Sequence, residues 1–488
     1  TIGGSGFRAL AANEISPAVT YAATNNVGLV HSSVGGLIAG AQSTNSITLN
    51  ANGGFTAVGP LPGADVLTIT SGGILALAGN TGLNGGVLAA PGTSMFIWTP
   101  GAGTNLNLNS AITGSAGITK DGAGTVVVGT RQLYTGTTNI NNGTLKLSGG
   151  NNLIFVSGVG GVQAVNVNNG GTLDLNGNNQ AIGTLGSSNT TVQNTGGFVT
   201  NSSGTTSTFT SASAAATFAG AITGNLNFTR SGNATTVFLS NNTYTGATIL
   251  RGGNLTLQQG GALSGTSSVT SYFGTLVLDS TNNPLVDVSR VNSAAAITLQ
   301  GGTVQYLGFS GMDSTQNLGA VSLLAGASTI TATRGVGGSA VLTLASLTSS
   351  ANSTLNFTAG AGTLGLGGQL AVGNSQIIIT STPTLTNGII GGWAIVNGTD
   401  FATYRSTMDP STGAMGVGAL GANPVTAFPN PFGAYSTAAL TAGAGADNIS
   451  IGASVAGVTT RTINSLRINA ASTVTMTPGN LLTIGTGG

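Results

Sequence analysis

Short runs of alternating polar and apolar residues recur along most of this chain. Alternation with a period of two is clearest at Ser46–Asn50, Asn105–Asn109, Val165–Leu175, Asn254–Leu257 and Thr473–Thr477. This period, carried by Val, Ile, Leu and Thr, indicates strands, because successive side chains of a strand point to opposite faces. No stretch has the apolar spacing and caps of a helix. The pattern therefore predicts an all-β protein built from short strands.

Glycine corners separate these strands. The pattern Gly-x-Leu-x-Leu recurs at Gly143–Leu147, Gly171–Leu175, Gly253–Leu257 and Gly274–Leu278. We expect each glycine to permit a corner with positive φ. Both leucines of each pattern should then point to the same side, into a shared core.

A 37-residue stretch occurs twice without a gap, at Ala111–Leu147 and, 110 residues later, at Ala221–Leu257. Both copies begin with AITG, contain Tyr-Thr-Gly and end in Gly-x-Leu-x-Leu. Repeats of short strands at a fixed spacing are typical of a solenoid, in which one turn, or rung, stacks on the next. The 110-residue offset fits about five rungs of roughly 22 residues.

The segment Gly117–Gly149 resembles the autotransporter-associated β-strand repeat, also called the passenger-associated transport repeat. The second copy matches with Arg230 in place of Lys120 and a less regular strand at Ala234–Phe238. The resemblance implies a right-handed parallel β-helix with loop insertions, exported to the outside of a Gram-negative-type cell. It also implies surface structures rather than a fixed active site. The repeat-defining residues are Lys120, Tyr134, Gly136, Gly143, Leu145 and Leu147, and Arg230, Tyr244, Gly246, Gly253, Leu255 and Leu257.

Changes in the strand pattern divide the sequence into four parts. We expect an N-terminal segment, 1–43, that caps the solenoid or contacts another subunit, followed by a parallel β-helix over 44–388 that carries repeats 111–147 and 221–257. An irregular insertion or loop module covers 389–446, and further β-helix rungs cover 447–488, continued by a neighbouring subunit. Within the β-helix, a loop is expected to interrupt the strands around Gly301–Gly319.

The composition changes the picture of the surface. Charged residues make up 4% of the 488 and the formal net charge is +1, so like-charge repulsion between copies is weak and self-association is favoured. Eleven scattered Lys and Arg offer no basic patch, which excludes nucleic acid as a partner. The chain has no cysteine for disulfides or thiolate metal sites and no apolar run long enough for a transmembrane helix.

Candidate chemistry is sparse. The ten acidic residues form no close pair in the sequence, and His31 is the one histidine, so no triad or metal set is expected. Asp174 and Asp279 would align if their rungs stack, although an aspartate that caps a corner explains each. Asp400 and Asp409 flank Tyr404 and Arg405, which makes this stretch the best candidate for a small polar site. We expect no enzyme activity and no cofactor; a β-helix polysaccharide lyase or hydrolase is the remaining enzymatic alternative.

A second similarity links the two ends of the chain. The sequence pattern LTI-x-x-GG occurs at Leu67–Gly73 and again at Leu482–Gly488. We therefore expect the last residues to form part of a rung like the one near the start. This favours a subunit of an extracellular fibre or surface layer that polymerises by stacking β-helix ends. The expected partner is a second copy, and the candidate contacts are Thr1, Ile2, Phe7, Leu482, Ile484 and Gly488. The alternative is a monomeric adhesin passenger that binds glycans or cells through the insertion at Trp393–Tyr435.

Overall fold

The computed structural model describes residues 2–3, 6–7, 16–17, 25–29, 37–38, 40–50, 53–57, 66–77, 79–154, 163–212, 214–282, 289–365, 374–421 and 431–485. It divides into an N-terminal unit, Thr1–Ala247, and a C-terminal unit, Thr248–Gly488. The described part of both units contains strands and no helix, which confirms the predicted all-β class. None of the described residues forms a helix able to cross a membrane.

The strands of the N-terminal unit are β1 (Ile2–Gly3), β2 (Gly6–Phe7), β3 (Ser16–Pro17), β4 (Asn26–Leu29), β5 (Leu37–Ile38), β6 (Ala41–Leu49), β7 (Gly53–Ala57), β8 (Val66–Ala76), β9 (Asn80–Ala89), β10 (Ser94–Trp98), β11 (Asn105–Gly114), β12 (Gly117–Asp121), β13 (Thr125–Val128), β14 (Leu133–Tyr134), β15 (Thr138–Ile140), β16 (Gly143–Leu147), β17 (Ala164–Val167), β18 (Gly171–Asp174), β19 (Gln180–Ile182), β20 (Thr184–Gly186), β21 (Phe198–Thr200), β22 (Ser207–Ser211), β23 (Ala216–Phe218), β24 (Ala221–Ile222), β25 (Leu226–Arg230), β26 (Thr235–Phe238) and β27 (Asn241–Asn242).

The strands of the C-terminal unit are β28 (Thr248–Leu250), β29 (Asn254–Leu257), β30 (Ala262–Leu263), β31 (Ser268–Ser271), β32 (Thr275–Asp279), β33 (Ala296–Gln300), β34 (Thr303–Leu307), β35 (Ser314–Thr333), β36 (Ala340–Ser349), β37 (Ser353–Ala361), β38 (Ser375–Ile379), β39 (Ala394–Val396), β40 (Asp400–Arg405), β41 (Gly416–Ala419), β42 (Asn448–Ile451), β43 (Val455–Val458), β44 (Arg461–Ile463), β45 (Ser465–Ile468), β46 (Val474–Met476) and β47 (Leu482–Ile484).

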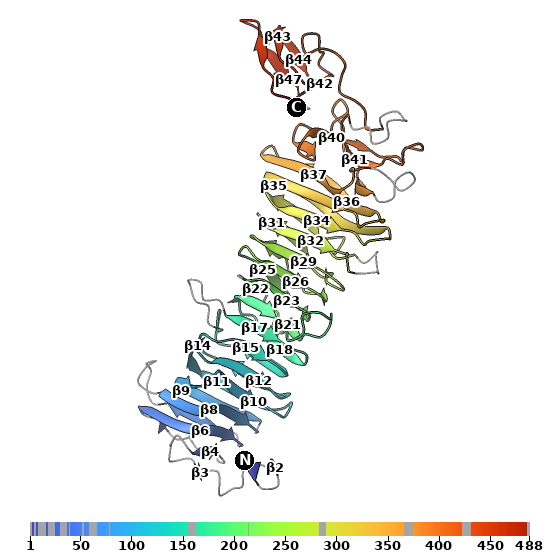
Figure 1. Ribbon diagram of the computed structural model, residues 1–488. Coiled ribbons are helices and arrows are strands. Elements are labelled where there is room, and N and C mark those ends of the chain that lie inside the picture. The colour runs from blue at the N-terminus through green and yellow to red at the C-terminus, as the bar shows by residue number, and fades with distance from the viewer. Residues whose placement is uncertain are drawn as a thin grey trace. The chain divides into compact units, whose positions relative to one another are not determined.

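The strands of the N-terminal unit stack in parallel, turn upon turn (Figure 1). From β12 to β25 each turn contributes one strand to each of three stacks, whereas longer strands before them, such as β11, serve two stacks. Strand β18 pairs in parallel with β21, three strands later. The strands between them belong to two other stacks, one running β12–β15–β17–β20 and one running β19–β22–β25. This arrangement is a parallel β-solenoid, which confirms the predicted fold class; the structure adds that the turn has three faces.

Apolar side chains fill the inside of each turn in columns. Val126, Leu145 and Leu173 lie opposite one another on β13, β16 and β18, and each is at most 1% exposed. Burying a side chain of this size stabilises the fold by about 1.5–3 kcal/mol. The alternation read from the sequence thus places its apolar residues in the core.

The two copies of the 37-residue repeat lie on different faces of the solenoid. Strand β12, in the first copy, belongs to the stack that contains β20, whereas its equivalent β25 belongs to the stack that contains β19. The 110-residue offset therefore corresponds to about five rungs, as expected, but not to a whole number of them. Successive turns differ in length: Ile118 lies opposite Thr138, Thr138 opposite Val165 and Val165 opposite Leu185, steps of 20, 27 and 20 residues.

Parallel stacks also build the first part of the C-terminal unit. One runs β28–β31–β33–β35, and another runs β29–β32–β34–β35, so the long strand β35 serves two faces. The loop expected around Gly301–Gly319 is mostly strand, since β34 and the start of β35 occupy it. Residues 308–313, between these strands, form the loop that is present.

The pairing changes beyond β39. Strand β40 pairs antiparallel with β39 and with β41. This part of the predicted insertion at 389–446 packs on the core through buried Tyr404, Val417 and Phe432.

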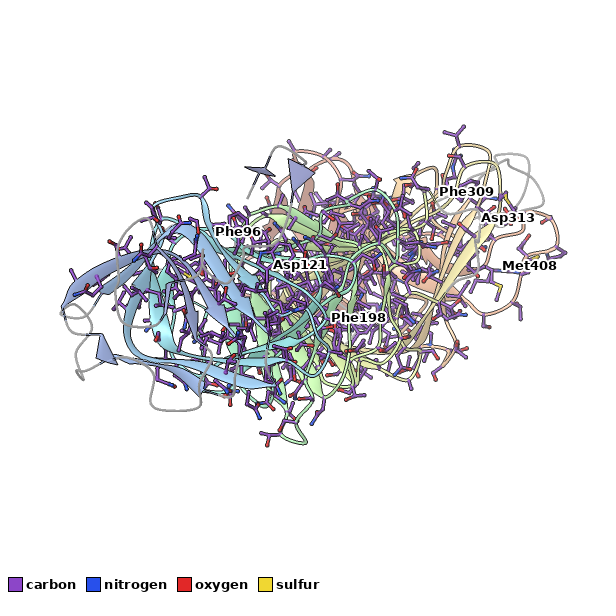
Figure 2. The ribbon with its side chains drawn as sticks, turned by 90° about the horizontal axis from the view of Figure 1, so that it is seen from below. Phe96, Asp121, Phe198, Phe309, Asp313 and Met408 are labelled. Carbon is purple, nitrogen blue, oxygen red and sulfur yellow. The ribbon has the colours of Figure 1, made fainter. Side chains whose placement is uncertain are left out.

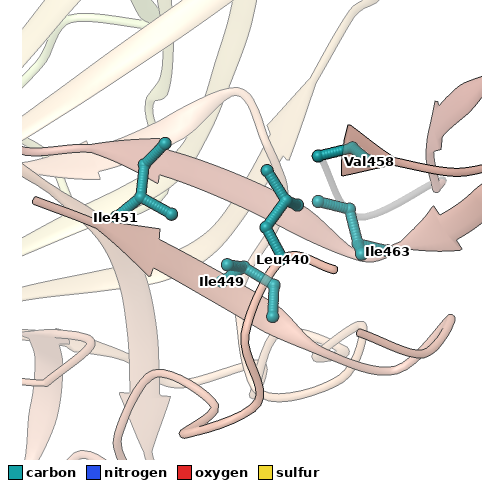
Figure 3. Packing of buried hydrophobic residues seen from close by; sticks show 5 residues of the cluster. All are labelled: Leu440, Ile449, Ile451, Val458 and Ile463. Atoms are coloured by element: carbon teal, nitrogen blue, oxygen red, sulfur yellow. The ribbon is translucent and has the colours of Figure 1, made fainter. Parts of the chain in front are cut away.

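Parallel pairing then returns in three two-stranded sheets, β42–β45, β43–β46 and β44–β47. These six strands form two rungs. Leu440, Ile449, Ile451, Val458 and Ile463 converge between them (Figure 3).

Candidate functional sites

Lys120 lies at a corner of the N-terminal unit with its side chain fully buried. Its Nζ donates hydrogen bonds to the carbonyl oxygens of Gly122 and of Asn142, the latter at 2.7 Å on the next rung. Desolvation lowers the pKa of the ammonium group to about 8, and the nearby Asp121 carboxylate partly opposes that shift. This repeat-defining lysine therefore lies inside the solenoid and binds backbone carbonyl groups of two rungs.

Arg230, the equivalent residue of the second copy, is also fully buried. Its guanidinium donates to the carbonyl oxygens of Ser211 at 3.0 Å and Ala234 at 2.6 Å. Sequence reasoning missed a third buried cation, Arg290, whose Nη1 donates to the carbonyl oxygens of Gln259 and Gly261 at 3.0 and 2.8 Å. No sequence feature distinguishes Arg290 from a surface arginine, because it lies outside both repeats.

Buried amides form a second set of corner residues that sequence reasoning missed. In the first copy, Gln132 Oε1 accepts a hydrogen bond from the Ile112 N–H at 2.9 Å, and Nε2 donates to the Thr130 carbonyl. In the second copy, Asn242 Oδ1 accepts from the Ile222 N–H at 2.9 Å and Nδ2 donates to the Ser240 carbonyl. All these positions are related by the 110-residue offset, which was the available signal.

The tyrosines and glycines of the repeat serve close packing. Tyr134 and Tyr244 are fully buried; burial raises the pKa of Tyr134, whose hydroxyl lies 2.5 Å from Thr138 Oγ1. A Cβ at Gly136 or Gly246 would lie 2.4 or 2.3 Å from backbone atoms of the facing rung. These glycines leave no space for any other residue.

The Gly-x-Leu-x-Leu segments differ at their glycines. Gly143 and Gly253 have φ of 65° and 61°, as expected for a corner. Gly171 and Gly274 do not have positive φ; a Cβ there would lie 2.2 Å from the Ile140 oxygen and 2.8 Å from the Leu250 Cβ. The leucines that follow in the two repeats, Leu145, Leu147, Leu255 and Leu257, are at most 1% exposed.

The two aspartates considered for alignment each hold a corner, and Asp174 also links its corner to the next rung. Asp174 accepts hydrogen bonds from the backbone N–H groups of Asn176 and Ser202. Asp279 accepts from the N–H and hydroxyl of Thr281. They lie in different units, and their contacts fit the capping interpretation.

A polar pocket of about 280 Å³ lies beside β40 in the C-terminal unit. Asn387, Thr403, Tyr404, Arg405, Phe432 and Asn448 are among its lining residues. Tyr404 Oη donates to the Ile379 carbonyl at 2.7 Å and accepts from the Ile379 N–H. Arg405 pairs with Asp409 at 3.1 Å. The polar groups of Tyr404 and Arg405 are therefore engaged by residues outside the lining, and the lining contains no carboxylate to act as a general acid or base.

Asp400, the other predicted member of that site, belongs to a separate cluster. It pairs with Arg467 at 3.2 Å, and the Arg467 guanidinium lies 5.2 Å from the ring centre of Tyr435. Desolvation raises the pKa of the Tyr435 hydroxyl to about 12. This cluster links β40 to β45 of the terminal rungs, so it stabilises the packing of these two parts of the unit.

Hydrogen bonds from Ser411 and Thr412 hold the pKa of Asp409 well below its usual range. This carboxylate therefore stays ionised and serves the turn that follows it. Across the described part of the chain, no three His, Cys, Asp or Glu side chains gather where they could hold a metal ion. His31 lies outside the described residues.

The predicted assembly contacts are only partly visible. Ile2 lies opposite Phe7 in the antiparallel pair β1–β2, and Thr1 and Gly488 lie outside the described residues. On β47, Leu482 is half-buried against the terminal cluster and Ile484 is 40% exposed. Leu481 and Ile468, on the same rung, are also exposed.

Comparison with known proteins gives one informative similarity. Over 292 residues the chain is 26% identical to the "Adhesin BmaC autotransporter" of Brucella suis biovar 1 (strain 1330). The match covers 59% of this chain and 7% of the length of that relative. No known protein family matches the chain, and no solved structure matches it. The similarity agrees with the passenger-type repeat read from the sequence, and the solenoid agrees with a passenger-like fold.

Proposed function

We propose that this chain is a non-enzymatic segment of a surface-exposed, adhesin-like passenger of a Gram-negative-type bacterium. The observation that carries the proposal is the coincidence of a parallel β-solenoid with similarity to an autotransporter named as an adhesin. The buried cations and amides support it, because they bind backbone groups inside the solenoid and leave no reactive cluster among the described residues. Such a protein acts by exposing a binding surface rather than by catalysing a reaction.

An adhesion assay tests this proposal. Latex beads coated with the purified chain are expected to bind cultured epithelial cells or bacterial cells well above beads coated with albumin. Beads coated with heat-unfolded chain provide the control for adsorption. Binding no higher than that of the albumin beads on both cell types would refute the adhesive role.

We further propose that copies of the chain stack end to end through the terminal rung. The outer edges of β45, β46 and β47 have no strand partner among the described residues. An open sheet edge offers unpaired N–H and C=O groups to another strand. Exposed Ile468, Leu481 and Ile484 add apolar surface beside that edge, and the low net charge removes repulsion between copies.

Sedimentation velocity and electron microscopy over a range of concentrations test the stacking. Wild-type chain is expected to form end-to-end particles, and Ile484→Asp is expected to abolish them by placing a charge at the edge. Leu77→Asp, an outward leucine of the N-terminal unit that is 50% exposed, is the matched control and should assemble like the wild type. A wild-type chain that stays monomeric at the highest concentration would refute stacking without affecting the adhesion assay.

A further inference from the structure

Two large aromatic side chains point outward side by side on β10. Met95 and Ile97 of this strand are fully buried, whereas Phe96 is 40% exposed and Trp98 is 45% exposed. The chain has two tryptophans in 488 residues, and aromatics make up 5% of it. Placing one tryptophan beside a phenylalanine on the outer face is costly unless something covers them, and exposed apolar groups of this kind mark binding surfaces.

The neighbouring strands place one glycine, one leucine and two polar residues beside these rings. Phe96 lies opposite Gly73 of β8 and Thr119 of β12, and Trp98 lies opposite Leu75 and Asp121. Strands within a stack are about 4.8 Å apart, so side chains at these positions on one face are adjacent. Gly73 has no side chain, and the atoms nearest to where its Cβ would lie belong to Ser71 and Ser46, both small polar residues.

Hydrogen-bonding groups line the other side of the aromatic pair. Ser94 Oγ and Thr119 Oγ1 lie 2.7 Å apart. Asp121 (labelled with Phe96 in Figure 2) accepts one hydrogen bond, from the Gly122 N–H at 2.6 Å. A carboxylate can accept several, so capacity remains for a ligand hydroxyl. Further along the same face, Asn166 Nδ2 donates to Asn139 Oδ1 at 2.9 Å.

We propose that Phe96, Trp98, Thr119 and Asp121 form a binding surface for a neutral glycan; this deepens, and rests on, the proposed adhesin-like function. A sugar ring has an apolar face of C–H groups that packs on an aromatic ring. Its hydroxyls project from the edge, where Asp121 accepts and Thr119 donates or accepts. Aromatic rings with a few convergent polar groups are the usual composition of small-ligand sites.

The charge and the small area of this surface favour a neutral glycan over an anionic polymer, a protein or a second copy of the chain. Lys120, next to Asp121 in the sequence, is buried with its ammonium group on backbone carbonyls, so it offers nothing to an anionic polymer. Two partly exposed side chains present far less than the roughly 800 Å² per partner of a stable protein interface. The surface therefore suits a carbohydrate better than a protein or a second copy.

Native gels containing dextran, mannan, xylan or galactan test the proposal with the whole chain. At least one polysaccharide is expected to slow its migration. Trp98→Ala should weaken that binding at least about tenfold, Phe96→Ala by a similar factor, and Asp121→Asn by about threefold. Phe198→Ala is the matched control, since Phe198 is 51% exposed on β21 of the same unit, and it should bind as the wild type does.

A second readout avoids disturbing the surface. Trp393→Phe leaves Trp98 as the one indole, and its emission should shift or be quenched when the retarding polysaccharide is added. Retardation by none of the four polysaccharides, equal retardation of Trp98→Ala and Phe198→Ala, or an unchanged emission would each overturn the proposal. So would a change in sedimentation of sugar-free Trp98→Ala, because that outcome assigns the surface to a second copy. Adhesion of beads without polysaccharide binding would overturn this inference alone.

Discussion

The two copies of the 37-residue repeat use the same corner design with different interiors. In the first copy, aliphatic Ile118, Val126 and Val128 fill the turn. In the second, Phe228 packs against Phe209, Phe238 and Tyr244, with ring centres 6.4, 5.1 and 6.3 Å apart. The cation, the amide and the close-packed glycine remain in both. The comparison shows that the repeat specifies how corners satisfy the backbone and leaves the volume of the core free to vary.

The largest effect is expected at the shared glycine. Gly136→Ala and Gly246→Ala each force a Cβ against backbone atoms, and both should lower the free energy of unfolding by about 3 kcal/mol or more. Chemical denaturation of each variant measures the loss. Gly103→Ala, where no atom lies within 4 Å of the added Cβ, is the control. A loss in one copy and not the other would break the comparison.

The buried cations should give the two repeat copies different contributions to the pH dependence of the free energy of unfolding. The folded pKa of Lys120 is about 8, below its usual 10.5, so the unfolded chain binds more protons between these values and stability rises as pH increases through that range. The gain is up to about 3 kcal/mol. Lys120→Arg, which copies the second repeat, should remove this rise, because the guanidinium keeps its proton.

Denaturation midpoints of the wild type and Lys120→Arg at pH 7 and pH 10 test this expectation. The difference between the two proteins isolates Lys120 from other titrating groups. Arg230→Lys should add a second pH-dependent rise. Parallel pH profiles for all three proteins would contradict the assignment.

The corner amides should respond alike to loss of their polar atoms. Gln132→Leu leaves the Ile112 N–H without its acceptor, and Asn242→Leu does the same to the Ile222 N–H. Each should cost about 2 kcal/mol of unfolding free energy, with faster hydrogen exchange at that amide. Gln163→Leu offers a comparison at a buried amide outside the repeat. An unchanged exchange rate at either N–H would show that its corner amide is dispensable.

The smallest effect is expected from the tyrosine hydroxyl. Tyr134→Phe keeps the ring in the core and removes the contact with Thr138, at a cost of about 1 kcal/mol. The double variant with Thr138→Val should recover part of this cost, since both polar groups are then absent. A double variant less stable than the sum of the two single changes would exclude a direct contact.

The alternation of polar and apolar residues was sufficient to predict the fold class and the columns of buried leucine, as at Leu145 and Leu147. It could not reveal that Lys120 is buried, because a lysine in a strand is ordinarily solvated and one of its two carbonyl partners, Asn142, lies on the next rung. The face shift between copies was hidden for a similar reason: turn lengths vary with the corners, so an offset in residues does not count rungs.

The candidate sites were less predictable than the fold. Tyr404 and Arg405 do line a pocket, but Asp400 lies in a different cluster because β40 directs its two ends to different neighbours. On β10, alternation alone assigns Phe96 and Trp98 to one face and Met95 and Ile97 to the other. Which face is inside depends on the pairing with β8 and β12, which the text does not show.

The displacement of the two repeats by one face bears on how such a chain can lengthen during evolution. Two different faces of the turn accept the start of the same stretch, so an inserted duplicate does not have to complete a full circuit. Equivalent outward residues, such as Val127 on β13 and Val237 on β26, then lie on different faces. Duplication of a stretch in such a molecule therefore places the same kind of outward side chain on different faces of the solenoid.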